Sequence, residues 1–174
     1  MREICDDLAD EHRSLSGLLE QIDDAGFATP TPAEGWTVHD QVAHLWYFDQ
    51  RAAWSLTEPD RFSTDLARLM ASEGIDEAVT VGRSMAVRDL REAWSVGAGE
   101  LVAMARGVDP SSRVPWYGPA MSARSSMSAR LMEAWAHGHD IAYALGVERE
   151  PTMRLRTSMR PTRPGWKRWG KFMR

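Results

Sequence analysis

Two stretches of the sequence carry histidine and carboxylate side chains at spacings that would place them on one face of a helix. In "RLMEAWAHGHDIAYALG" (residues 130–146), Glu133 and His137 are four residues apart, and Asp140 follows three residues later on the same face. In "WTVHDQVAHLWYFD", His44 lies beside the apolar stripe of the expected helix. Charged groups near a protein core cost free energy unless they are paired. We therefore expect these side chains to share a partner.

A metal ion is one such partner. Metal sites in the cores of helical bundles are built from His and Glu side chains that project inward from facing helices, and His44, Glu133 and His137 form a set of this kind. These ligand types suit Zn2+, and also another divalent metal such as Ni2+, Fe2+ or Mn2+. Three protein ligands leave a fourth position open to water or substrate. Asp40 or Asp140 is expected to hold the outer N–H of a ligating imidazole.

The spacing alone has a simpler interpretation. A Glu and a His four residues apart are common on exposed helix faces, where the pair contributes only a few tenths of a kcal/mol. No C-x-x-C or H-E-x-x-H motif supports a metal site, and no serine lies in a G-x-S-x-G turn, so no catalytic residue is identified. His39 and His139 are expected to face solvent, because helical geometry turns them about 140° from His44 and about 160° from His137.

Hydrophobic periodicity predicts an all-α protein with four long helices and a short extra one. The predicted helices cover residues 2–24, 38–57, 87–106 and 123–145, with the shorter one at about 60–71. Thr37 is the expected N-cap of the second long helix, with Asp40 in a capping box, and Gly146 is the expected stop after the last. Glu11 falls within the apolar stripe of the first helix and is expected to reach water at its edge. Such helices are typical of a four-helix bundle.

Charge divides the chain of 174 residues into two parts. Residues 1–150 carry 13 basic and 25 acidic groups, whereas residues 151–174 carry eight basic groups and no acidic one. The first part is predicted to be the metal-binding bundle, and the second a basic tail that is largely disordered. The abrupt change of composition favours a frameshift or truncation; the alternative is a biological tail whose Trp166 and Trp169 touch anionic membrane or nucleic acid. For the chain as a whole, no nucleic-acid partner is expected.

The aromatic residues have two expected roles. Trp116 and Tyr117, in the loop before the helix that carries Glu133, either line the open coordination position or cap the end of the bundle. Because aromatic side chains dominate core burial, four tryptophans are expected in the core or an interface: Trp36, Trp46, Trp94 and Trp135.

A cytoplasmic location is expected. No apolar run approaches the roughly 20 residues of a membrane span, and the acidic N-terminus does not resemble a signal peptide. Cys5 is the single cysteine, so no internal disulfide can form.

The stretches "GWTVHDQVAHL" and "LMEAWAHGHDIAYALGV" together resemble the mycothiol-dependent maleylpyruvate isomerase N-terminal domain family, within the DinB-like metal-binding superfamily. "TPAEGWTV" and "VPWYGPAMS" are especially similar to a branch known only as metal-binding proteins. The resemblance covers about residues 1–152. It implies a DinB-like up-down-up-down four-helix bundle in which His44, Glu133 and His137 hold a divalent metal, usually zinc. The family often has Gln at the position of His139, which agrees with a non-ligand role.

The resemblance also implies a function. The metal of such a protein would bind a low-molecular-weight thiol as thiolate and activate it as a nucleophile, as in a metal- and thiol-dependent transferase, isomerase or hydrolase. Fold analogy does not establish a reaction. The alternative is a non-catalytic metal-binding or dimerisation module, for which an occupied site would suffice. A homodimer is among the expected partners.

Overall fold

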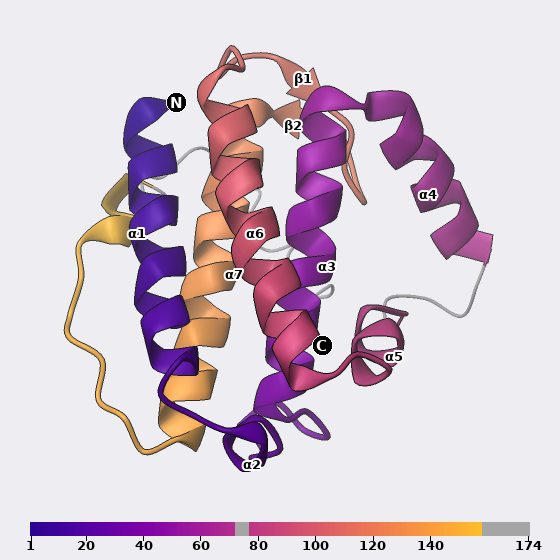
Figure 1. Cartoon of the computed structure of the whole chain (residues 1–174). Helices are drawn as coiled ribbons and strands as arrows, with labels where there is room; N and C mark the ends of the chain where they lie inside the picture. The colour runs from indigo at the N-terminus through magenta and orange to yellow at the C-terminus, as the bar shows by residue number, and fades with distance from the viewer. Residues whose placement is uncertain (72–76, 158–174) are drawn as a thin grey trace.

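The computed structural model describes residues 1–71 and 77–157, and four long helices form its centre (Figure 1). The long helices are α1 (Arg2–Leu19), α3 (Val38–Thr57), α6 (Val87–Arg106) and α7 (Ala123–Ala144). The shorter elements are α2 (Asp24–Phe27), α4 (Pro59–Ala71), α5 (Glu77–Arg83), the 3-10 turn η1 (Arg154–Thr157), and the paired strands β1 (Arg113–Val114) and β2 (Met121–Ser122). The predicted helical bundle is confirmed, whereas the two-residue strands were not predicted.

Local signals fix the ends of these helices. Thr37 accepts a hydrogen bond from the backbone of Asp40 and the Asp40 carboxylate accepts one in return, so the predicted capping box starts α3. Gly146, just beyond α7, adopts a φ of 66°, a left-handed conformation that glycine allows without strain. The first helix ends at Leu19, earlier than predicted, and Asp23 caps the separate short helix α2.

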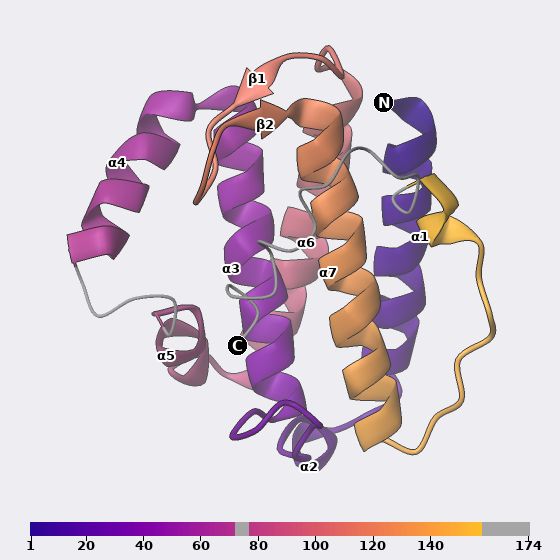
Figure 2. The same cartoon turned by 180° about the vertical axis from the view of Figure 1, so that it is seen from behind.

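The direction of the helices differs from the prediction. Each of α1 and α3 packs against both α6 and α7, so α1 and α3 lie on one diagonal of the bundle. Figures 1 and 2 show that α1 and α7 run one way, while α3 and α6 run the other. The order is therefore down, up, up, down, and the expected alternation is wrong. The cause is the connection between α3 and α6, in which α4 and α5 carry the chain back to the end where α3 began.

Glu11 is a second correction. Its side chain is fully buried and does not reach water at the helix edge. The carboxylate pairs instead with Arg149, beyond the end of α7, and with Arg154 of η1 at 2.8 Å. A buried carboxylate is tolerated when cations pair with it. Through these ion pairs, Glu11 of α1 binds the segment that follows α7, residues 149–154.

The first residues of the basic tail also differ from the prediction, because they form a turn and pair with α1. Disorder was expected from residue 151, but Arg154–Thr157 forms a turn, and Arg156 pairs with Asp7 of α1 at 3.2 Å. The prediction for the rest of the tail, residues 158–174, lies outside the described residues. Within the described part of the chain, no helix is both long enough and apolar enough to cross a membrane.

Candidate metal centre

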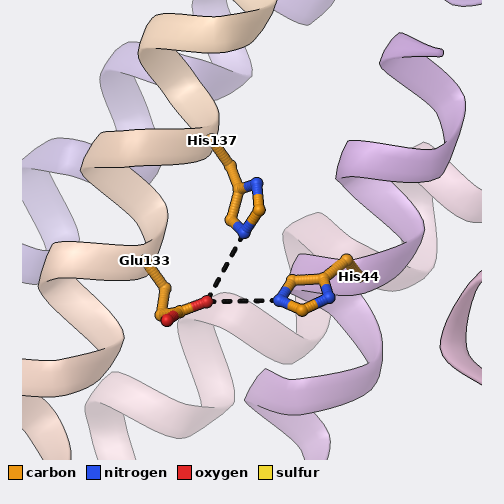
Figure 3. A group of neighbouring side chains, drawn as sticks. All are labelled: His44, Glu133 and His137. Carbon is orange, nitrogen blue, oxygen red and sulfur yellow. Dashed lines mark hydrogen bonds and ion pairs between the residues drawn. The ribbon is translucent and has the colours of Figure 1, made fainter. Parts of the chain in front are cut away.

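Three side chains from two helices meet on the inner side of the bundle, between α3 and α7 (Figure 3). The Nε2 atom of His44, on α3, lies 3.2 Å from Oε2 of Glu133 on α7. The Nε2 atom of His137, one turn further along α7, lies 3.4 Å from the same oxygen. All three ligand atoms lie within 4.8 Å of one another. The structure thus brings together the three residues that the sequence predicts as ligands.

The separations of the Glu133 oxygen from the two imidazole nitrogens are of the size that a small cation needs. Zinc binds imidazole nitrogen and carboxylate oxygen at about 2.0–2.2 Å in tetrahedral geometry, which places neighbouring ligand atoms about 3.3–3.6 Å apart. The two distances from the Glu133 oxygen are 3.2 and 3.4 Å. The side chains are partly accessible, with 14% of His44, 21% of Glu133 and 17% of His137 exposed. Solvent or a small molecule can therefore reach the group.

Gln41 fixes the orientation of His137. Its amide nitrogen donates to Oγ1 of Thr31 at 3.0 Å and lies 3.4 Å from a carboxylate oxygen of Asp140. Because an ionised carboxylate only accepts hydrogen bonds, the amide oxygen of Gln41 must face the other way, where it accepts a hydrogen bond from Nδ1 of His137. Because Gln41 takes Nδ1, the nitrogen of His137 left to bind a metal is Nε2, the atom that faces Glu133.

The protonation states favour metal binding. Burial lowers the pKa of His44 from 6.5 to about 4, despite the opposing hydrogen bond with Glu133, so this imidazole is neutral at pH 7. Burial would raise the pKa of Glu133, but hydrogen bonds with His137 and His44 and the charge of Arg130 outweigh it and hold the pKa well below its usual range. Neutral imidazole and ionised carboxylate are the forms that bind metals.

Aromatic rings surround the two imidazoles. Trp36, in the loop before α3, stacks on His137 with ring centroids 6.1 Å apart and lies 5.3 Å from the ring of His44. Phe48, one turn after His44 on α3, contacts the ring of His44, with the two ring centroids 4.6 Å apart. Trp36 was expected in the core or an interface, and its place beside both imidazoles differs from that expectation. Trp94, by contrast, is buried in the core as predicted.

The two loop aromatics lie one layer further out. Tyr117 packs edge-on against Phe48, with ring centroids 5.4 Å apart, and so reaches His44 only through that ring. Trp116 stacks on Phe62 of α4 at 6.0 Å. These contacts place the two aromatics between α3 and α4, and both expected roles stay predictions.

The remaining predicted residues take separate positions. Asp40 accepts hydrogen bonds from Thr37 and pairs with Arg83 at 2.8 Å, so neither imidazole is its partner. Asp140 acts on His137 only through Gln41.

His39 and His139 were expected to face solvent, but both are half-buried. His39 contacts the backbone oxygen of Met85, and His139 packs on Trp135 and beside Arg149. Neither belongs to the group of three ligand atoms.

Sequence reasoning missed Gln41, Trp36 and Arg130. Gln41 lies three residues before His44 and shares its face of α3, a spacing that could have marked it as a neighbour of the site. Arg130 likewise lies three residues before Glu133. Trp36 lies in a loop, and no periodicity relates it to the helices that carry the ligands.

Comparisons with known proteins place these observations in a family. The sequence profile described as "Mycothiol maleylpyruvate isomerase N-terminal domain" matches residues 8–142. Two uncharacterized proteins of Mycobacterium tuberculosis, from strains CDC 1551 / Oshkosh and ATCC 25618 / H37Rv, are each 37% identical over 153 residues, or 87% of this chain. The chain spans 60% of the length of these relatives.

Solved structures share the fold. The crystal structure of the mycothiol-dependent maleylpyruvate isomerase matches with a TM-score of 0.62 and 20% identity, covering 80% of this chain and 60% of the other. The crystal structure of a His-to-Ala variant of that enzyme matches with a TM-score of 0.63 and 19% identity, over the same shares of the two chains. At this level of identity the likeness establishes the helical fold alone.

Proposed function

Because the chain belongs to the mycothiol maleylpyruvate isomerase N-terminal domain family, we propose that it binds one divalent metal, zinc in the first place, through His44, Glu133 and His137. The observation that carries this proposal is the convergence of two imidazole nitrogens on one carboxylate oxygen, at 3.2 and 3.4 Å. An exposed i, i+4 pair, the simpler interpretation of the sequence, does not account for the third ligand from a facing helix.

The surrounding residues prepare this donor set. Gln41 keeps the proton of His137 on Nδ1, so that Nε2 is free to bind. Burial keeps His44 neutral. Trp36 stacks on one imidazole and contacts the other, which restricts the rotation of both rings. A metal held in this way would supply a Lewis acid that binds a thiol as its thiolate at neutral pH.

The proposed activity is that of a metal- and thiol-dependent transferase or isomerase. Three protein ligands leave a coordination position for an exogenous group, and the ligand side chains are partly exposed. A low-molecular-weight thiol is the proposed occupant. The structurally similar isomerase is described as mycothiol-dependent, so mycothiol is the first thiol to test.

Metal content of purified variants tests the site. His44→Ala, Glu133→Gln and His137→Ala should each lose most of the bound metal, because each removes one of three ligands. His39→Ala and His139→Ala are matched controls, since they remove helix histidines that lie outside the group, and both should keep wild-type content. Elemental analysis of the five proteins gives the answer. Full metal content in the double variant His44→Ala/His137→Ala would overturn the assignment.

A further inference from the structure

A buried ion pair lies directly behind the proposed metal ligands. The Nε atom of Arg130, on α7, donates to Oδ1 of Asp49, on α3, at 2.9 Å. The side chains of Arg130 and Asp49 are 2% and 1% exposed. Arg130 precedes Glu133 by three residues, so the pair and the ligand share one face of α7.

Stability does not explain this pair. Apolar side chains of similar volume often replace a buried ion pair with no loss of stability, because desolvating two charges is costly. The pair is also incompletely satisfied, since Nη2 of Arg130 and Oδ2 of Asp49 lack a hydrogen-bond partner. His12 of α1 lies 3.7 Å from that oxygen, but burial lowers the pKa of His12, so it brings no compensating charge at pH 7. A function of this ion pair other than stabilising the fold is therefore expected from the neighbours of Arg130 and Asp49.

The position of the guanidinium suggests that role. Nη1 of Arg130 lies 4.0 Å from Oε2 of Glu133, the oxygen that both histidines approach. At that distance the two groups form an ion pair but no hydrogen bond. A guanidinium has five donors in a fork that matches a carboxylate, and an unrestrained arginine three residues from a glutamate can pair with it. Such a pair would occupy the oxygen that the metal needs.

We infer that Asp49 is a positioning residue: by binding Nε of Arg130, it holds the guanidinium away from Glu133 and leaves that carboxylate free for a metal ion. The inference rests on the proposed metal site and adds to it a competition between Arg130 and the metal for one oxygen. Asp49 touches none of the three ligands in this arrangement and acts only through Arg130.

Zinc affinity, measured by competition with a chromophoric chelator, tests the inference on three variants of the full chain. Asp49→Ala should weaken zinc binding by about 10-fold or more, the usual scale for residues that orient metal ligands. Arg130→Met, which removes the competitor, should not weaken it. The double variant Asp49→Ala/Arg130→Met should bind zinc nearly as tightly as the wild type, since the effect of Asp49 requires Arg130.

Circular dichroism and unfolding curves show whether each variant is folded. If Asp49→Ala does not fold, Asp49→Asn replaces it, alone and with Arg130→Met, because asparagine keeps the shape of the side chain and removes its charge. Zinc binding by the folded Asp49 variant at wild-type strength would overturn the inference. So would a double variant as weak as the single, because Asp49 would then act through packing and not through Arg130.

Failure of the inference is distinguishable from failure of the metal site. If the wild-type protein does not bind zinc, or if His44→Ala binds it equally well, the proposed function itself is wrong. The wild type could instead bind zinc through His44 while the Asp49 variant keeps wild-type zinc affinity, or while the double variant binds zinc as weakly as the single variant. In that case only the role of Asp49 is wrong.

Discussion

Replacing Gln41 by leucine should weaken metal binding without removing a ligand. The side chain is fully buried, and its amide oxygen is the acceptor for Nδ1–H of His137. Leucine has a similar volume and no acceptor, so the buried N–H is left unsatisfied, at a cost of about 1–3 kcal/mol. If the ring turns to recover a partner, Nε2 no longer faces Glu133. The expected loss is about 10- to 100-fold in zinc affinity, since 1.4 kcal/mol is a factor of ten.

Gln41→Glu is the informative counterpart. A carboxylate at this position still accepts from Nδ1 and increases the basicity of the ring. The substitution is made together with Asp140→Asn, because the Asp140 carboxylate lies 3.4 Å from the Gln41 amide and would repel a second carboxylate, and the zinc affinity of this double variant should equal or exceed that of the wild type. Chelator competition at neutral pH measures all three proteins, with His39→Ala as a control outside the site. Wild-type affinity in a folded Gln41→Leu protein would refute the reasoning. An equal loss in both Gln41 variants would show that packing, and not the acceptor, matters.

Three further predictions concern the thiol, the pH dependence and the buried carboxylate. With cobalt in place of zinc, a small thiol should produce a sulfur-to-metal charge-transfer band that strengthens as pH rises towards the free thiol pKa of about 8.5; no spectral change at millimolar thiol contradicts the thiol-dependent activity. In the metal-free protein, the pKa of His44 is about 4 in the folded state and 6.5 in the unfolded state. Between pH 6.5 and about pH 4, His44 is therefore protonated in the unfolded chain but not in the folded protein. The free energy of unfolding should therefore fall by up to about 3 kcal/mol as pH drops through that window, and His44→Gln should flatten the fall in urea titrations; an unchanged slope in that variant is the opposing result. Glu11 is buried between two arginines, so Arg149→Met should lower stability more than Arg154→Met, which is more exposed, and the double variant by about 3–5 kcal/mol; urea unfolding that shows no loss in the double variant contradicts this.

The helices and the ligand group follow from local periodicity. A spacing of four residues fixes the relation of Glu133 to His137 on any helix, and the apolar stripe of α3 turns His44 towards the same interior. The capping box at Thr37 is equally local, because both of its bonds lie within four residues. Features of this kind can be predicted from the sequence because the geometry of one helix determines them.

The features that the sequence did not predict depend on contacts between distant segments. An amphipathic stripe has no direction, so the course of α6 depended on the connection through α4 and α5. Glu11 looked like a surface residue because its partners, Arg149 and Arg154, lie more than 130 positions away. Gln41 and Asp140 also meet only in the folded chain. A polar residue within an apolar stripe is therefore ambiguous until its partner is known.

We propose that His44, Glu133 and His137 together hold a divalent metal. Crystals grown with zinc, with diffraction recorded above and below the zinc absorption edge, test it most directly. One strong anomalous peak is expected between the Nε2 atoms of the two histidines and the carboxylate of Glu133, with Gln41 still bound to Nδ1 of His137. A structure in which zinc lies elsewhere, or in which the carboxylate remains bonded to both imidazoles in the presence of saturating zinc, would contradict it.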